Sequence, residues 1–276
     1  MQKENSKSVL VVGGSSGIGF STAKRLANSN WRVAIASRKP PKDPDHGLDW
    51  FRMDVTEISS VESTLLEINQ KFSGIDSVVL CSGFAAFGAI EDTTCEEAEA
   101  QFDVNFFGTH RVCKTILPIM RAKGKGDIVI VGSLAGLIPL AFQAFYSASK
   151  HAIDCYAECL RYEVMNFGIR VVLIEPGDVS SEFTSNRVDV ASMKSSSPYF
   201  KWATACKKRM QFCEVRGQSP EAVAESIQKI LTNDSKRLRI RVTNTYEELV
   251  LLMRSWKLLA LYDFVAVKEF GLKVSQ

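Results

Sequence analysis

Histidine is scarce in this chain of 276 residues. It has three, His46, His110 and His151, and their spacing is not that of a metal-ligand set. The seven cysteines are odd in number and form no C-x-x-C pair. No secretory signal opens the sequence, because its first eight residues are polar. We therefore expect no metal ion and a reducing, cytoplasmic location.

Charge of one sign and long apolar runs are also lacking. The formal charge is +3 and no run of five or six basic residues occurs, which argues against a nucleic-acid partner. The most basic segment, 236–241, is interpreted as a solvated strand edge. The apolar runs in 247–270 are interrupted by charges and fall short of the ~20 residues of a membrane span. Amphipathic packing onto the body is favoured there, with peripheral contact at the cytosolic face of a membrane as the alternative.

What the sequence does contain is an alternation of short apolar runs and longer helical patterns. The runs are continuous and rich in β-branched residues, as parallel strands buried on both faces are. They lie at 9–12, 33–36, 77–80, 128–131 and 170–174, and the helical patterns at 17–29, 57–73, 94–122 and 146–167. Thr94 and Glu97 fit a capping box at the start of the third helix. This order predicts an α/β fold, a doubly wound parallel sheet of Rossmann type with helices on both faces.

The remaining chain is expected to cover the carboxyl edge of this sheet. We expect one domain over 1–276, with a substrate lid at about 182–216 and helices at about 219–270. The lid is rich in aromatic residues and methionine, which suit an adaptable apolar pocket wall. Packing of the lid onto the body is the simpler explanation for the same residues. The sequence leaves the two open.

A glycine cluster follows the first predicted strand and opens the first helix. Gly13 permits a tight turn, Gly17 lets the backbone approach a pyrophosphate, and Gly19 allows close packing of helix on sheet. The free N–H groups of the helix N-terminus then face the phosphates. The expected cofactor contacts in this loop are Gly13, Ser15, Ser16, Gly17, Ile18 and Gly19.

The end of the second strand predicts which cofactor binds. A site for NAD would place a carboxylate there to bond the ribose 2′-hydroxyl, but the chain has Ser37 followed by Arg38. A guanidinium suits a 2′-phosphate through charge-assisted hydrogen bonds. The sequence therefore favours NADP(H), with NAD(H) as the alternative.

Three residues form the candidate reaction centre. Tyr146 and Lys150 are four apart on a helical segment and share one face. An ammonium near a phenol favours the phenolate and is expected to lower the tyrosine pKa toward the working pH. Ser133 follows a buried strand at the carboxyl edge, where its hydroxyl can bond a substrate oxygen as negative charge develops.

These motifs together resemble the short-chain dehydrogenase/reductase superfamily over about residues 8–270. The loop matches its T-G-x-x-x-G-x-G signature with Val12 in place of threonine. Segment 102–108 matches the helix that supplies the family's asparagine, so the resemblance implies that Asn105 joins Ser133, Tyr146 and Lys150 as the fourth catalytic member and anchors a water for proton relay. It also implies that Asn105, Tyr146 and Lys150 contact the cofactor.

Further cofactor contacts are implied by the same resemblance. Asp54 and Val55 stand where the family contacts the adenine. Segment 176–181 is similar to the P-G-x-V-x-T segment around the nicotinamide carboxamide, which assigns Pro176, Gly177, Val179 and Ser181 to it. Of the family's N-N-A-G motif, at 80–83, only Gly83 is kept. The later chain is similar to the 17β-hydroxysteroid dehydrogenase and retinol dehydrogenase branch.

The predicted function is an NADP(H)-dependent oxidoreductase that interconverts a carbonyl and an alcohol on a bulky apolar substrate such as a steroid, retinoid or lipid. Reduction of a 3-ketoacyl or 3-keto-sphingoid chain is the alternative within enzymes. A non-catalytic NADP(H)-binding regulator is the alternative of another class. The resemblance implies a homodimer or homotetramer joined through the helices at 94–122 and 146–167.

Overall fold

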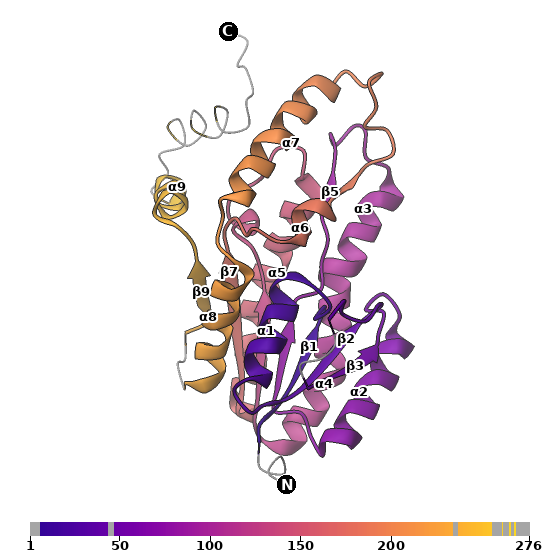
Figure 1. Cartoon of the computed structure of the whole chain (residues 1–276), viewed down its shortest axis with the longest axis vertical. Coiled ribbons are helices and arrows are strands. Elements are labelled where there is room, and N and C mark those ends of the chain that lie inside the picture. The colour runs from indigo at the N-terminus through magenta and orange to yellow at the C-terminus, as the bar shows by residue number, and fades with distance from the viewer. Residues whose placement is uncertain are drawn as a thin grey trace.

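Seven parallel strands form the central sheet of the computed structural model (Figure 1). The structure describes residues 6–43, 47–233, 237–255, 261, 265 and 268, without the side chains of 184 and 185. Across the sheet the strand order is β3-β2-β1-β4-β6-β7-β9. The strands are β1 (Ser8–Val12), β2 (Arg32–Ser37), β3 (Leu48–Arg52), β4 (Ser77–Leu80), β6 (Gly126–Val131), β7 (Ile169–Pro176) and β9 (Arg239–Val242).

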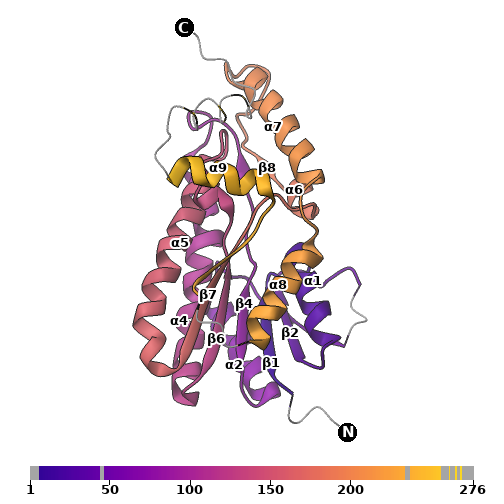
Figure 2. The ribbon, with the colours of Figure 1, turned by 90° about the vertical axis from the view of Figure 1, so that its left-hand side faces the viewer.

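Helices cover both faces of the sheet, as Figure 2 shows in a side view. On one face α1 (Gly17–Ala27) and α8 (Pro220–Thr232) pack side by side. On the other lie α2 (Ile58–Phe72), α4 (Gly108–Lys123) and α5 (Ala144–Val164). The doubly wound α/β fold is thereby confirmed.

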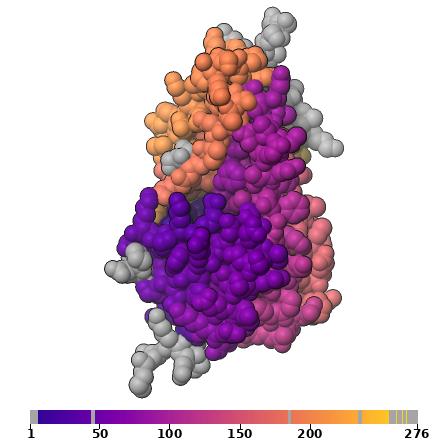
Figure 3. All heavy atoms as spheres, turned by 90° about the vertical axis from the view of Figure 1, so that its right-hand side faces the viewer, coloured from indigo at the N-terminus to yellow at the C-terminus, as the bar shows by residue number. Residues whose placement is uncertain are grey.

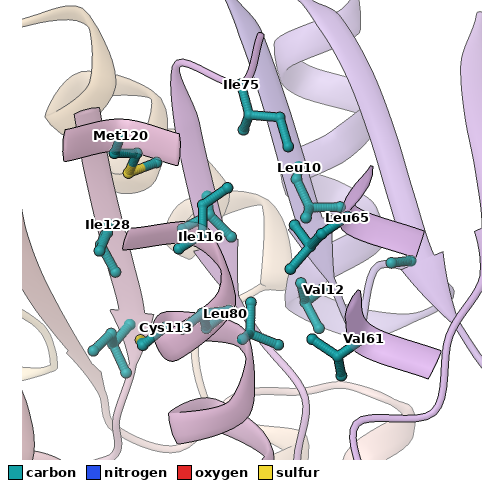
Figure 4. Close-up of a cluster of buried hydrophobic side chains, with 14 of the residues drawn as sticks. Leu10, Val12, Val61, Leu65, Ile75, Leu80, Cys113, Ile116, Met120 and Ile128 are labelled. Carbon is teal, nitrogen blue, oxygen red and sulfur yellow. The ribbon is translucent and has the colours of Figure 1, made fainter. Parts of the chain in front are cut away.

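Alternate residues of each strand feed two separate cores, because successive side chains point to opposite faces. In β1, Leu10 and Val12 pack against α2 and α4, with Leu65 and Ile116 among their neighbours (Figure 4). Val9 and Val11 face α1 and α8 instead. The continuous apolar runs in the sequence are a direct result of this two-sided burial.

The helix expected over 94–122 is present but is not α-helical throughout. It begins as α3 (Cys95–Phe102), passes through one π-helical turn, η1 (Asp103–Phe107), and continues as α4. The capping box at its start is confirmed: Glu97 N donates to Thr94 Oγ1 at 3.2 Å, and Thr94 N donates to Glu97 Oε2 at 3.0 Å. The π-turn holds Asn105, which periodicity alone could not single out.

The strand edge expected within 236–241 is present as β9, which follows α8, pairs with β7 and lies at the edge of the sheet, so the helical pattern expected from about 219 is interrupted there. Its arginines are less solvated than the sequence indicated. Arg239 pairs with Asp154, Glu158 and Glu175, and Arg241 with Glu175 and Glu248. Helix α9 (Thr245–Ser255) comes next. The predicted helices beyond 255 lie outside the described residues, apart from 261, 265 and 268.

The predicted lid, residues 182–216, contains α6 (Glu182–Ser185), β8 (Val188–Asp189) and α7 (Phe200–Val215). Strand β8 pairs with β5 (Ala86–Phe87) to form a separate two-stranded sheet. In Figure 1 the lid elements stand above the carboxyl end of the central sheet. Figure 3 shows the orange lid meeting the indigo N-terminal segment on one face of the molecule.

Candidate active site

The candidate site lies where the strand order reverses. From β1 the chain moves outward through β2 and β3, then returns to the other side of β1 as β4. Gly13 follows β1, its N–H donating to Ala36 O at 2.8 Å, and Cys81 after β4 donates to Val12 O at 2.8 Å. Crevices at such switch points are where open parallel sheets bind ligands.

The glycine loop has the shape that a dinucleotide needs. Gly13 has φ +78°, and a side chain on Gly19 would collide with the Gly13 carbonyl. The first hydrogen bond of α1 runs from Phe20 N to Ser16 O, so the preceding N–H groups have no acceptor within the helix. An anion fits this helix end.

A cleft of about 440 Å³ lies between this loop and the start of the lid. An ion pair from Lys42 Nζ to Glu182 Oε1, at 2.9 Å, links its two sides. Hydroxyl groups and glycine make up much of the lining, which suits phosphate. The lining residues are Ser15, Ser16, Gly17, Phe20, Ser21, Lys42, Asp43, Ser180, Ser181, Glu182 and Pro220.

The residues expected to select the cofactor lie together at the ends of β2 and β3. Ser37 Oγ donates to Lys39 O at 2.7 Å and accepts from Trp50 Nε1 at 3.1 Å. Arg38 is exposed. Partial burial acts to raise the pKa of Asp54, but hydrogen bonds from Thr56 and the charge of Arg38 outweigh it. The pKa of Asp54 is therefore lowered overall. Asp54 is therefore ionised next to Arg38. Val55 is buried and packs closely on Gly108: a Cβ added to Gly108 would lie 2.7 Å from Val55 Cγ2.

Ser133, Tyr146 and Lys150 are brought together by the packing of α5 on the turn after β6. Ser133 caps the short 3₁₀ turn η2 (Leu134–Gly136), accepting from Ala135 N at 3.1 Å. The turn packs so tightly on α5 that a Cβ on Gly136 would lie 2.9 Å from the Lys150 carbonyl. Ser133 lies near enough to Tyr146 to oppose the rise in the pKa of its phenol, and Lys150 Nζ donates to Val131 O at 2.9 Å.

Gly83 and Asn105 complete this group from two further elements. A Cβ on Gly83 would lie 3.2 Å from Asn105 Oδ1 and 3.9 Å from Lys150 Nζ. The buried Asn105 amide accepts from Phe84 N at 3.0 Å and donates to Phe84 O and Ser149 Oγ, each at 3.1 Å. It therefore ties the loop after β4 to α5. Its proposed relay of protons stays a prediction.

The electrostatics differ from the expectation for the tyrosine. Burial raises the pKa of Tyr146 to about 12; the Ser133 side chain and the Arg187 charge act against that rise, and Glu214 adds to it. The predicted direction was wrong for this structure because desolvation of the phenolate dominates. Burial also lowers the pKa of Lys150 to about 8, opposed by Cys81. A neutral phenol thus stands beside an easily deprotonated ammonium.

The predicted nicotinamide segment follows β7 and is tied to distant parts of the chain. Pro176 ends β7, and Gly177 N donates to Val242 O at 3.0 Å. Val179 bridges Gln218 in parallel fashion. Ser181 Oγ would lie 4.0 Å from a Cβ on Gly17, so this segment faces the glycine loop. Of the sequence-predicted residues, Ser15, Ser16, Gly17 and Ser181 therefore line one cleft, while Gly83, Asn105 and Lys150 lie together beside α5.

Of three lid residues near Tyr146, Phe183 is one of the aromatic residues expected to form the apolar lid wall, while Arg187 and Glu214 carry no sequence motif and were missed. The Phe183 ring lies 5.6 Å from the Tyr146 ring, centroid to centroid. Arg187 and Glu214 form a buried ion pair whose charges reach the tyrosine. The only sequence signal was their place in the predicted lid, because nothing links two residues 27 positions apart before the lid is folded.

A family model of the short chain dehydrogenases matches residues 7–191. The chain belongs to this family. It is 32% identical to 3-ketodihydrosphingosine reductase of Bacteroides thetaiotaomicron over 248 residues, 90% of this chain and 92% of that protein. It is 30% identical to retinol dehydrogenase 8 of Homo sapiens over 266 residues, 89% and 84% of the two chains.

Solved structures support the fold. A short-chain dehydrogenase from Streptomyces avermitilis matches with TM-score 0.79 and 24% identity, covering 97% of this chain and 98% of that one. A short-chain dehydrogenase/reductase from Burkholderia phymatum, solved with NAD, matches with TM-score 0.79 and 20% identity over 95% and 97%. Family membership makes this chain an oxidoreductase of alcohols and carbonyls that uses a nicotinamide cofactor. Among the described residues, no helix is both long and apolar enough to span a membrane.

Proposed function

We propose that this chain is an NADP(H)-dependent oxidoreductase that interconverts a carbonyl and an alcohol on a bulky, lipid-like substrate. The observation that carries the proposal is the convergence of Ser133, Tyr146 and Lys150 beside the glycine loop. A bound nicotinamide supplies or accepts the hydride. In this proposal Tyr146 and Ser133 both bond the same substrate oxygen.

In reduction, the neutral Tyr146 phenol donates its proton to the substrate oxygen as negative charge develops there. Ser133 donates a hydrogen bond to the same oxygen and stabilises that charge. The Lys150 ammonium lowers the free energy of the phenolate left behind. Asn105 holds the loop of Gly83 and Phe84 against α5, which fixes the floor of the site. In oxidation the phenolate accepts the proton back.

The substrate class follows from the surroundings of Tyr146. Ala85, Ala135, Leu140 and Phe183 pack around it, so a substrate there meets a largely apolar wall. The names of two relatives, a 3-ketodihydrosphingosine reductase and a retinol dehydrogenase, specify a long-chain ketone and an apolar alcohol. Both support a lipid-like substrate, and the first favours a 3-keto-sphingoid chain as the second candidate.

The catalytic assignment is tested by Tyr146→Phe. Turnover of long-chain ketones with NADPH should fall at least about a thousandfold, because the general acid is lost, while NADPH still binds. Tyr162→Phe is the matched control, since Tyr162 lies on the same helix and is exposed. Equal activity of the two variants would contradict the assignment. Full NADPH binding in a wild-type chain without turnover would favour the regulator.

The cofactor preference is tested by Arg38→Ala. A guanidinium at the end of β2 suits a 2′-phosphate, so the Kd for NADPH should rise about ten- to a hundredfold while the Kd for NADH changes little. Lys39→Ala, which removes the neighbouring exposed cation, is the control. An unchanged ratio of NADPH to NADH affinity in Arg38→Ala would show that another group selects the cofactor.

Homo-oligomer formation through α4 and α5 and peripheral membrane contact are further proposals. Large apolar side chains are exposed on or beside these helices, including Phe107, Tyr162, Met165 and Phe167. Exposed apolar side chains at both ends of α4 and on α5 support a partner along these helices. Light scattering of the purified chain tests the oligomer. Vesicle flotation tests the peripheral membrane contact proposed for residues 247–270.

A further inference from the structure

A buried ion pair in the lid has hydrogen-bonding capacity that the protein does not use. Arg187 lies just before β8 and Glu214 near the end of α7, and their side chains are 1% and 12% exposed. Within the described residues, Nε and Nη1 of Arg187 and Oε2 of Glu214 find no hydrogen-bond partner. Buried donors and acceptors are rarely left unpaired, because each costs its full desolvation.

The pair lies in the lid, near Tyr146. Val188 N, next to Arg187, donates to Ala85 O at 2.9 Å, and Ala85 packs in the same small cluster as Tyr146. The Arg187 guanidinium carbon lies 5.8 Å from the centre of the Phe87 ring. Both charges are near enough to the phenol to alter its pKa, in opposite directions. The unused atoms are therefore buried in the lid close to Tyr146, the residue proposed to contact the substrate oxygen.

The charges of the Arg187–Glu214 pair and its neighbours indicate what this pair can bind. Arg187 and Glu214 neutralise each other, and the neighbouring Lys207 is likewise paired with Asp189, at 2.6 Å. A buried neutral pair offers no net attraction to an anionic or a cationic head group. It offers free donors and a free acceptor side by side. A hydroxyl group matches this arrangement because it both accepts and donates a hydrogen bond.

We propose that Arg187 and Glu214 form a polar subsite that binds a hydroxyl group of the substrate close to the reacting carbonyl, with Arg187 donating to it and Glu214 accepting from it. The inference rests on the proposed function and deepens it: the substrate is a hydroxy ketone or a diol on an apolar chain. A substrate without that hydroxyl leaves the buried polar atoms unpaired and is rejected.

The test compares three compounds of equal chain length: a long-chain β-hydroxy ketone, the same ketone without the hydroxyl, and the corresponding keto acid. Binding is measured by calorimetry on the full-length Tyr146→Phe chain with NADPH, and turnover on the chain with Tyr146 intact. We expect the hydroxy ketone to bind at least about tenfold more tightly than the plain ketone, with the same preference in kcat/KM.

In the double variant Arg187→Met/Glu214→Gln, the ratio of the affinities, and of the kcat/KM values, for the hydroxy ketone and the plain ketone should fall close to one. The plain ketone should still be turned over. Removing both charges avoids an uncompensated one. Asp189→Asn/Lys207→Met is the matched control, because it removes an exposed pair that also joins β8 to α7, and it should keep the preference.

Two results would overturn the subsite: a double variant that keeps the preference, or a Tyr146→Phe chain with Arg187 and Glu214 in place that binds the plain ketone or the keto acid best. Preference in binding without turnover would uphold the subsite and refute the proposed function. Turnover without a preference in binding would refute the subsite and uphold the proposed function.

Discussion

Replacing Gly13 by alanine should damage both the fold and the cofactor site, and the structure separates two causes. An L-residue at φ +78° is strained by about 1–2 kcal/mol. The new Cβ would also lie 2.7 Å from Ser82 N and 2.8 Å from the Cys81 carbonyl carbon. Both are backbone atoms at the end of β4 and cannot rotate away, so overpacking adds about 1–3 kcal/mol.

Gly124→Ala isolates the first cause. Gly124 has φ +69° and nothing within 4 Å of a Cβ, so this variant should lose about 1–2 kcal/mol from strain alone. Gly13→Ala should lose about 2–5 kcal/mol in total. Urea unfolding of the two variants and the wild type measures the difference.

The same pair of variants tests the cofactor loop. Relief of the contact with β4 must move the loop, so Gly13→Ala should weaken NADPH binding at least about tenfold, a loss of about 1.4 kcal/mol. Gly124, at the far end of α4, should leave binding unchanged. Equal losses of stability in the two variants, or wild-type affinity for NADPH in Gly13→Ala, would refute the packing argument.

Three further variants test other features. Asn105→Ala leaves the buried Phe84 backbone groups unpaired, so it should cost about 2–4 kcal/mol in urea unfolding and lower kcat more than NADPH affinity. Burial raises the pKa of Glu175 to about 7, so the folded chain binds more protons and its free energy of unfolding should fall as pH rises from about 4.5 to 7. Glu175→Gln should abolish that fall, and an unchanged slope would contradict it. Thr94→Ala removes the capping box and should lower the unfolding free energy by about 1 kcal/mol without changing kcat, as thermal melts and assays would show.

Much of the fold was predictable because strands that are buried on both faces appear in the sequence as continuous apolar runs. The five apolar runs all became central strands. β3 was not among those runs, since it is the edge strand and only Phe51 within it is buried. β9 was expected as a strand edge, but the ion pairs of its arginines were not, because their partners Glu158 in α5 and Glu175 in β7 are remote in sequence.

The site was predictable where spacing along one element decides the geometry. Tyr146 and Lys150 share a helix, and the glycine loop follows its strand directly. Features set by tertiary contacts were not predictable: the π-turn at Asn105, the direction of the Tyr146 pKa shift, and the Arg187–Glu214 pair. Each depends on burial, which arises only when the lid, α5 and the β4 loop come together.

The contact between α9 and the segment after β7 bears on how this chain can be re-engineered. Glu247 accepts hydrogen bonds from Asp178 N and Asn244 N, each at 2.7 Å, and a side chain on Gly177 would run into its carboxylate. Grafting the C-terminal region of a relative to alter substrate choice would therefore disturb the backbone proposed to hold the nicotinamide. Chimeras should carry residues 176–181 and α9 from the same parent.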